Sequence, residues 1–398
     1  MFHEKFKAKS LLGDKTILVI EPNANYRMTM KGFLQNFGIK NVKFTHSSKE
    51  AKNLLLTEDP GIIICEWNQP DINGIQLCKE LKSQPRYVNV PFLLLSVENL
   101  KKDIVLASEV GIDGYLLKPF SQQEFEASLQ TTLRTIVEPN PINNLLAKAQ
   151  YCLNQKLYDK AQKLVETAIK VKPNSARALS ILASIHKMNG LKDQAKSLLE
   201  DAIAINPAYM DAIKLLLDIY QEDEDMEKLR EYAEVAHELS PENSKYILIL
   251  ARCNLEEGKV DLSERMFKRA IKYAPKMAEA YKGLGKLYLI KEEYDLAMKN
   301  LNKALDLDDD DISILNSLGM AYVKVHRYAE GVEKYQTALK IKPNDHRILF
   351  NLGYANEKLE DIEKAEFYYK QAILHKPDFD KAARRLENLE QAHKAEAS

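Results

Sequence analysis

Features that would indicate a membrane protein, a secreted protein or a metalloprotein are missing from this 398-residue sequence. No apolar run approaches the roughly 18 residues that a membrane helix needs. The four cysteines lie far apart, without a CxxC pair or a histidine at ligand spacing, so they predict reduced thiols and no zinc site. We therefore expect a cytoplasmic protein that is neither inserted in a membrane nor built around a metal.

A strong charge of either sign is missing as well. Lys and Arg number 57 and Asp and Glu 58, which gives a net charge of -1 at pH 7. Nucleic-acid-binding domains usually carry a basic surface, and no segment here has the basic recognition helix of a DNA-binding output domain. A nucleophile–base pair and a glycine-rich phosphate loop are also lacking. The sequence therefore predicts neither direct nucleic-acid binding nor an enzyme.

What the sequence does contain is a proline that recurs every 34 residues in its C-terminal part. The series is Pro173, Pro207, Pro241, Pro275, Asp309 in place of the fifth proline, Pro343 and Pro377. A fixed period of this length indicates helix-turn-helix units that bury their apolar faces against their neighbours. Residues 142–377 divide into seven such units without an insertion, and an array of this kind presents an extended surface for other proteins.

Two positions of the unit carry small residues, as expected where two helices cross closely. Position 27 is alanine throughout: Ala168, Ala202, Ala236, Ala270, Ala304, Ala338 and Ala372. Position 8 is alanine or glycine except in the third unit, where Leu217 predicts a local distortion. Together with the prolines that recur every 34 residues, which we call the ladder prolines, these positions resemble the tetratricopeptide repeat (TPR). After the last proline, residues 378–398 predict an amphipathic helix that caps the array.

In the TPR family, positions 2, 5, 9 and 12 of each first helix line a concave groove. In units four to seven these positions include Lys245, Arg252, Lys282, Lys286, Asn316 and Arg347. The resemblance implies a protein or peptide partner that is acidic or ends in a carboxylate. Family members that clamp a terminal carboxylate have a pattern that Lys282 fits, whereas Lys286, Asn316 and Ser317 do not. The alternative is that these charges form a solvated face of a groove used in another way.

The N-terminal part, residues 14–137, alternates short apolar runs with helical patterns. The runs are residues 17–21, 41–44, 62–65, 92–96 and 115–118. Runs this apolar predict parallel strands that are covered on both faces. We therefore expect an α/β doubly wound domain of the flavodoxin-like type with five parallel strands, joined by a short linker at residues 138–141 to an all-α TPR solenoid.

Polar residues end or follow four of these runs, namely Glu21, Glu66, Ser96 and Lys118. Ligands in such sheets bind at the carboxyl ends of the strands. With the segments EWNQPDINGIQL and YLLKPF, this constellation resembles the response-regulator receiver domain. The resemblance implies that Glu66 stands where the family has a phosphoryl-accepting aspartate, and that Ser96 and Tyr115 belong to the retained switch.

The expected magnesium ligands are incomplete. Receiver domains have two acids after the first strand, but here Glu21 is followed by Pro22, which has no side-chain oxygen. Asn68 can offer its backbone carbonyl, yet Mg²⁺ requires near-ideal octahedral geometry, so we expect weak or absent magnesium binding and no cofactor. Glu66 is one methylene longer than aspartate, and we expect it to pair permanently with Lys118 and so mimic phosphorylation.

These resemblances imply a non-enzymatic signalling adaptor of a two-component-type system. A degenerate receiver, or pseudo-receiver, would act as a regulatory or docking domain, and the TPR groove would bind a protein partner. Two alternatives stay open. In one, the receiver serves only for docking, with Glu66 and Lys118 as a buried structural pair; in the other, Glu66 is phosphorylated and its phosphorylation state gates partner binding.

Overall fold

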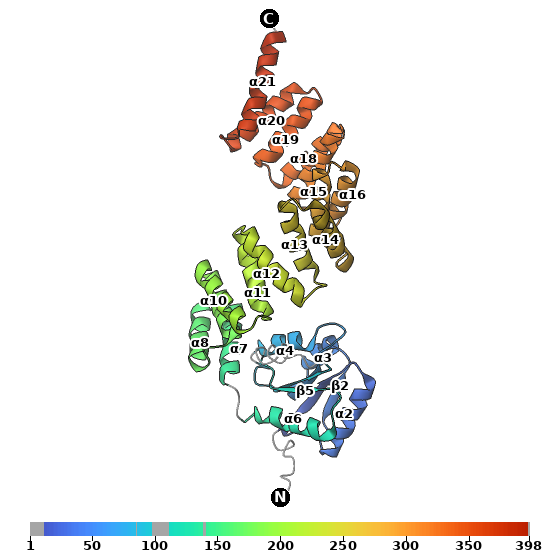
Figure 1. Ribbon diagram of the computed structural model, residues 1–398, viewed down its shortest axis with the longest axis vertical. Helices are drawn as coiled ribbons and strands as arrows, with labels where there is room; N and C mark the ends of the chain where they lie inside the picture. The colour runs from blue at the N-terminus through green and yellow to red at the C-terminus, as the bar shows by residue number, and fades with distance from the viewer. Residues whose placement is uncertain (1–11, 85, 98–110, 138–140, 397–398) are drawn as a thin grey trace. The chain divides into compact units, whose positions relative to one another are not determined.

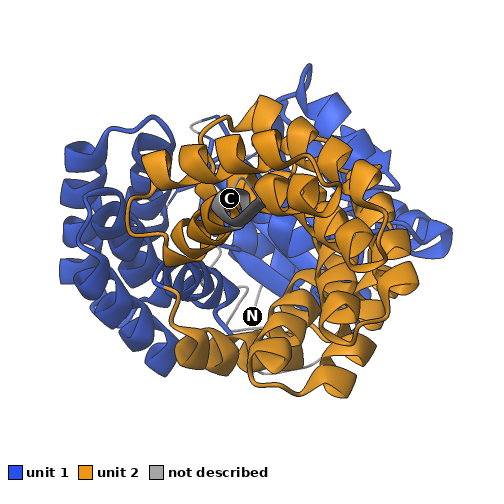
Figure 2. Cartoon of the chain, turned by 90° about the horizontal axis from the view of Figure 1, so that it is seen from above, with its two compact units in different colours: residues 1–223 blue, residues 224–398 orange. Residues whose placement is uncertain are grey.

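The computed structural model describes residues 12–84, 86–97, 111–137 and 141–396. The chain divides into two compact units, residues 1–223 and 224–398 (Figure 2). The boundary falls inside the third repeat, between helices α11 (Met210–Glu222) and α12 (Met226–Leu239). This is the repeat in which Leu217 takes the small position. Most of the linker expected at residues 138–141 lies outside the described residues, and Pro141 is already the first residue of α7.

Five parallel strands form one sheet in the order β2-β1-β3-β4-β5. They are β1 (Thr16–Ile20), β2 (Val42–Thr45), β3 (Pro60–Glu66), β4 (Phe92–Ser96) and β5 (Gly114–Leu117). Each of the five predicted runs is therefore a strand. This strand order is the flavodoxin-like one, so the predicted fold class of the N-terminal domain is confirmed.

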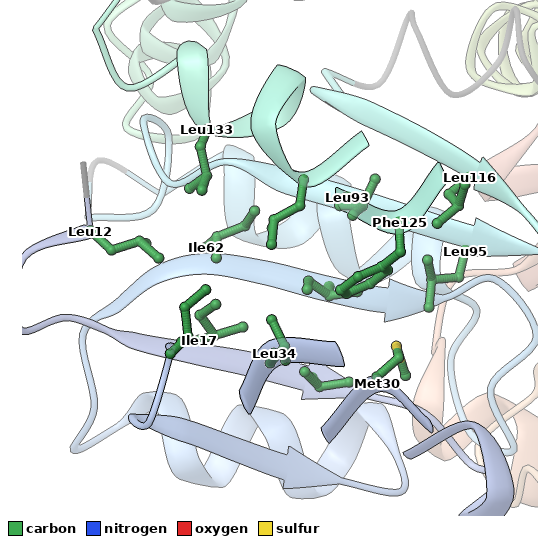
Figure 3. Packing of buried hydrophobic residues seen from close by; sticks show 14 residues of the cluster. Leu12, Ile17, Met30, Leu34, Ile62, Leu93, Leu95, Leu116, Phe125 and Leu133 are labelled. Carbon is green, nitrogen blue, oxygen red and sulfur yellow. The ribbon is translucent and has the colours of Figure 1, made fainter. Parts of the chain in front are cut away.

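Helices cover both faces of the sheet (Figure 1). Helices α2 (Ala24–Asn36) and α6 (Gln122–Arg134) pack on one face, and α3 (Ser48–Leu55) and α4 (Gly74–Lys82) pack on the other. Successive strand residues point to opposite faces, so Ile17 joins the first core and Leu18 the second. Figure 3 shows the first core, in which Met30 and Leu34 of α2 and Phe125 of α6 meet the strand side chains.

Antiparallel helix pairs follow the sheet. Outside the third repeat they are α7 (Pro141–Asn154), α8 (Tyr158–Val171), α9 (Ala176–Met188), α10 (Lys192–Ile205), α13 (Ser244–Glu256), α14 (Val260–Tyr273), α15 (Ala278–Ile290), α16 (Tyr294–Leu305), α17 (Ile312–Lys324), α18 (Tyr328–Ile341), α19 (His346–Lys358) and α20 (Ile362–His375). The first helix of a repeat packs on the second, as α15 does on α16. The predicted all-α solenoid is thus confirmed.

The small positions lie where the sequence pattern requires close packing. All seven alanines at position 27 are fully buried. At position 8 of the sixth repeat, a Cβ atom on Gly319 would lie 2.4 Å from the ring of Tyr335, which is itself almost fully buried. Position 8 is therefore small because a large side chain of the second helix crosses directly over it.

The ladder prolines end the second helix of each repeat. The residue before each proline is the helix C-cap and has left the helical conformation, for example with φ -138° and ψ 92° at Lys172. Proline disfavours the helical conformation in the residue that precedes it, which explains this exit. Where Asp309 replaces the proline, α16 ends earlier, at Leu305, and its C-cap Asp306 keeps right-handed helical angles.

A second ladder, which the sequence pattern did not reveal, lies between the two helices of each repeat. Position 15 has a positive φ in every repeat: Lys156, Gly190, Glu224, Gly258, Glu292, His326 and Glu360. Only two of these seven residues are glycine. A left-handed conformation costs a residue with a side chain about 1–2 kcal/mol, so five repeats carry backbone strain at this turn.

The helix predicted after Pro377 is α21 (Asp380–Glu396). Its Ala382, Leu386 and Leu389 pack against the apolar cluster of the seventh repeat. Arg385 adds an ion pair to Glu357 of α19, with a distance of 2.9 Å. Among the residues that the structure describes, no helix has the length and apolar character needed to cross a bilayer.

Candidate functional site

Strand register brings the predicted receiver residues to one edge of the sheet. Ile20 of β1 lies beside Cys65 of β3, so the next residues along the two strands, Glu21 and Glu66, are neighbours. On the next two strands of the sheet, β4 and β5, the backbone N–H of Lys118 donates to the carbonyl of Ser96, at 2.7 Å. The carboxyl ends of four strands thus supply the four polar residues that the sequence singled out.

Lys118 joins the two carboxylates. Its Nζ lies 2.5 Å from Oε2 of Glu21 and also forms an ion pair with Oε2 of Glu66. The side chains of Lys118, Glu21 and Glu66 are only 3%, 1% and 7% exposed. We call these three residues the buried triad. With two carboxylates and one ammonium group, its formal charge is -1 when all three are ionised.

Backbone amides hold the remaining carboxylate oxygens. Oε1 of Glu21 accepts a hydrogen bond from the N–H of Asn23 at 2.9 Å, and Oε1 of Glu66 accepts one from the N–H of Asn68 at 3.2 Å. The sequence had suggested Asn68 as a source of a carbonyl ligand, whereas the structure shows its N–H serving Glu66. Each glutamate therefore has one oxygen on Lys118 and the other on the backbone, which fixes its orientation.

Tyr26 is a member of the site that the sequence reasoning missed. Nζ of Lys118 lies 4.2 Å from the centroid of the Tyr26 ring, close enough for a cation–π interaction. The ring also lies against Phe120, at a centroid distance of 5.9 Å. The available signal was position, since Tyr26 occupies the first turn of the helix that follows β1.

Burial dominates the electrostatics of this edge. Desolvation raises the pKa of Glu66, although the hydrogen bond and the charge of Lys118 oppose the shift. Burial likewise raises the pKa of the neighbouring Cys65 thiol well above its usual value. The pKa of Glu66 is raised despite a direct ion pair because the effect of burial outweighs that of Lys118, and the nearby charge of Glu21 adds a smaller contribution in the same direction.

The described residues do not fit a magnesium ion. Both carboxylates that would approach the metal already bind the ammonium group of Lys118, and Pro22 supplies no side-chain oxygen. Mg²⁺ needs near-ideal octahedral coordination by oxygen. The ammonium group therefore supplies the positive charge that these two carboxylates require.

The two expected switch residues occupy neighbouring strands. Ser96 is the last residue of β4 and is 2% exposed. Tyr115 lies in β5, and its half-buried ring packs against the apolar core under α3 and α4.

Two of the six predicted groove residues already have partners within the array. Nζ of Lys282 pairs with the carboxylate of Asp311 at 2.6 Å, and Asp311 also caps α17. Oδ1 of Asn316 accepts a hydrogen bond from Asn351 at 2.8 Å. The other four, Lys245, Arg252, Lys286 and Arg347, form no ion pair with any of the residues that the structure describes.

The fold of the N-terminal domain and the polar residues at the carboxyl ends of its strands define a response-regulator receiver domain. The helix pairs that follow it define TPR repeats. The family model described as the response regulator receiver domain matches residues 17–130. Tetratricopeptide repeat models match residues 146–213 and 346–379. A model of the tetratricopeptide repeat protein 21 C-terminal ARM domain matches residues 226–352.

Curated relatives resemble the receiver part. The chemotaxis protein CheY homolog of Campylobacter jejuni is 29% identical over 120 residues, which covers 30% of this chain and 92% of the relative. Chemotaxis protein CheY1 of Helicobacter pylori is 28% identical over 120 residues, covering 30% of this chain and 97% of that protein.

Solved structures resemble the repeat part. MamA is 21% identical, with a TM-score of 0.36, and the match covers 42% of this chain and 92% of MamA. YrrB, described as a TPR protein with an unusual peptide-binding site, is 15% identical, with a TM-score of 0.33 and coverage of 56% of this chain and 97% of YrrB.

Proposed function

We propose that this protein is a non-enzymatic cytoplasmic signalling adaptor of a two-component-type system. Residues 14–137 serve as a pseudo-receiver, a regulatory or docking domain without phosphotransfer. The seven repeats of residues 142–377, capped by residues 378–398, bind a protein partner with acidic character. The balanced charge of the chain favours a protein partner over direct contact with nucleic acid.

The buried triad is the observation that carries this proposal. A carboxylate that accepts a phosphoryl group needs a free oxygen facing the donor and a cation that neutralises the transferred charge. Both oxygens of Glu66 are occupied, one by Lys118 and the other by the N–H of Asn68. The ammonium group that would assist transfer is shared with Glu21. The carboxylate of Glu66 is thus held by an ion pair and a hydrogen bond, and it has no free oxygen to face a phosphodonor.

Phosphorylation tests the pseudo-receiver directly. The protein is incubated with Mg²⁺ and a small phosphodonor, and intact mass and peptide mass spectrometry follow a phosphoryl group at residue 66. The matched control is the double variant Pro22→Asp, Glu66→Asp, which restores the family's acids. We expect labelling of the double variant only. A stable phospho-species at Glu66 of the wild type would instead support the phosphorylatable response regulator.

Affinity capture tests the division of labour between the two parts. The full chain and residues 138–398, with helical content checked by circular dichroism, are used to recover partners. We expect the repeats alone to retain the partner, because the array supplies the binding surface. A folded repeat fragment that recovers none of the full chain's partners contradicts this assignment.

A further inference from the structure

We infer that the receiver docks on the first three repeats of its own chain, through α4 and the loops that precede β4 and β5, and thereby closes position 2 of these repeats to a partner. This inference rests on the proposed function, in which the receiver is a regulatory or docking domain. It adds where the receiver binds and which part of the array it occupies. Both sides of the contact belong to the compact unit of residues 1–223.

Each of the first three repeats contributes position 2 of its first helix to this contact. These residues are Asn143 of α7, Arg177 of α9 and Asp211 of α11. Asp211 forms an ion pair with Lys79 of α4. A Cβ atom on Gly111, in the loop before β5, would lie 3.1 Å from a guanidinium nitrogen of Arg177 and 3.7 Å from the side-chain amide carbon of Asn143. Residues that lie 34 positions apart in the chain thus face one domain.

A hydrogen bond brings a third segment of the receiver into the contact. Nδ2 of Asn144, the residue after position 2 in α7, donates to Oδ1 of Asn89 in the loop before β4, at 3.2 Å. The charge of Arg177 is also felt in α4. Burial raises the pKa of Cys78 in that helix to about 12, and the positive charge of Arg177 is among the smaller effects that oppose this rise.

Burial at the start of α9 shows what the contact covers. All seven residues of the segment 175–181 are buried, including the charged Arg177. Repeat five, like repeat two, has a repeat on either side, yet its equivalent residues 277–283 include only one buried residue, Ala280. A helix at the surface of an array buries one face against its neighbours. The cover over the other face of α9 therefore comes from the receiver.

Position 2 itself gives the same contrast. Arg177 is 9% exposed. At the same position of repeats four, five and seven, Lys245, Glu279 and Arg347 are exposed. These repeats share the helix geometry of repeat two and lie outside the unit that contains the receiver. Receiver docking, and not the repeat fold, thus accounts for the burial of Arg177.

The receiver segments that make the contact are joined to one another from within. Lys82 of α4 pairs with Asp113, just before β5, at 2.7 Å, and both residues have buried side chains. Nζ of Lys82 also donates to the carbonyls of Val88 and Val90, in the loop before β4, at 3.3 and 2.8 Å. One ammonium group therefore connects α4 to both loops. Such preorganisation lowers the cost of ordering a binding surface.

The docking surface and the buried triad lie at opposite edges of the sheet. Asn89 and Gly111 precede β4 and β5, whereas Glu66 ends β3 and Lys118 follows β5. In a parallel sheet the beginnings of the strands form one edge and their carboxyl ends the other. The receiver can therefore hold the first repeats without involving the triad.

Arginine labelling of the full-length protein tests the contact with an internal reference. Phenylglyoxal modifies accessible guanidinium groups, and peptide mass spectrometry follows the rate at each arginine. Arg347, at position 2 of the seventh repeat, is exposed and serves as the reference. We expect Arg177 to react at least about ten-fold more slowly than Arg347, because it reacts only when the contact opens.

Charge variants identify the receiver as the cover. Lys79→Glu places a like charge beside Asp211 and is expected to raise the labelling rate of Arg177 at least about three-fold. The double variant Lys79→Glu, Asp211→Lys restores opposite charges and should return the rate to within about two-fold of the wild type. The control Lys31→Glu makes the same charge change on exposed α2, on the other face of the sheet, and should leave the rate unchanged. Circular dichroism confirms that the variants remain folded.

Three outcomes overturn the inference: Arg177 reacts as fast as Arg347 in the wild type, Lys79→Glu raises the rate no more than Lys31→Glu does, or the double variant keeps the rate of Lys79→Glu. Failure of the proposed function is distinguishable from these. If Arg177 is unprotected while affinity capture still recovers a partner through the repeats, the docking contact is wrong and the adaptor function stands.

Discussion

Replacing Lys118 by methionine tests how strongly the buried triad depends on its single cation. The change keeps a side chain of similar length and removes the charge. Glu21 and Glu66, with side chains only 1% and 7% exposed, would then face each other without a counter-ion. Removing one partner of a buried ion pair costs about 3–5 kcal/mol, because an uncompensated charge stays in the interior.

This loss is large for one domain. Domains are typically stable by about 5–15 kcal/mol, so a loss of about 3–5 kcal/mol in Lys118→Met removes at least about a fifth of the stability of a typical domain. The variant Glu66→Gln provides a contrast, because Lys118 keeps its ion pair with Glu21 at 2.5 Å. We expect Glu66→Gln to stay within about 1 kcal/mol of the wild type.

The assay uses the only tryptophan of the chain, Trp67, which directly follows Glu66. Its fluorescence in urea reports unfolding of the receiver, while circular dichroism at helical wavelengths follows mainly the repeats. The exposed Lys31→Met of α2 is a matched control that removes one charge from the same domain. We expect its midpoint to equal that of the wild type.

The penalty in Lys118→Met depends on pH in a defined direction. Burial raises the pKa of Glu66 even with Lys118 present, and without Lys118 the opposing effect is lost. A raised pKa means that the folded state binds the proton more tightly than the unfolded state, so the penalty is full at neutral pH and shrinks as pH falls through the raised pKa. A loss below about 1 kcal/mol at neutral pH, or a loss that grows on acidification, refutes the reasoning.

Further predictions concern the repeats. Glu292→Gly relieves the positive φ of 61° and should stabilise the array by about 0.5–1 kcal/mol in urea unfolding followed by circular dichroism, whereas Gly258→Ala, at φ 73°, should destabilise it by about 1–2 kcal/mol; opposite signs would contradict the strain. Gly319→Ala places a Cβ atom 2.4 Å from an aromatic ring and should cost about 1–3 kcal/mol; no loss would show that the crossing is loose. Hydrogen bonds from Lys268 and a second lysine lower the pKa of Glu264 to about 2. The stabilisation by Glu264 is therefore complete above the ordinary pKa of a glutamate and is lost as pH falls from there to its lowered pKa of about 2. Glu264→Gln should cost about 1 kcal/mol at neutral pH and progressively less in acid. An equal cost of Glu264→Gln at neutral and at acid pH would contradict this.

The sequence predicted the elements more completely than their chemistry. Short apolar runs located all five strands, because the strands of a parallel sheet are buried on both faces and therefore consist almost entirely of apolar residues. The proline ladder located the ends of the second helices, because proline constrains the residue before it. Position 15, in contrast, was not predicted. Its positive φ belongs to the turn that ends the first helix, in which the N–H of the next residue bonds to the carbonyl five residues back, as from Arg327 to Tyr322, and most residues at this position are not the glycine that would mark such a turn.

The site was partly predictable for the same physical reasons. Strand ends collect at one edge of a parallel sheet, so Glu21, Glu66, Ser96 and Lys118 were expected together. The sequence did not reveal that Lys118 pairs with both glutamates or that Tyr26 lies over its ammonium group. Those facts depend on side-chain rotamers and on the path of the chain after β1. Pairings such as that of Lys282 with Asp311 are likewise visible only when neighbouring repeats are packed.

The central claim is that Lys118 supplies the cation at the receiver site, and magnesium binding tests it most directly. Mg²⁺ is titrated into the wild type and into Pro22→Asp, Glu66→Asp, and the fluorescence of the adjacent Trp67 reports binding. The account predicts no saturable change for the wild type at millimolar Mg²⁺ and a saturable change for the double variant. A saturable response of the wild type at or below millimolar Mg²⁺ would contradict it.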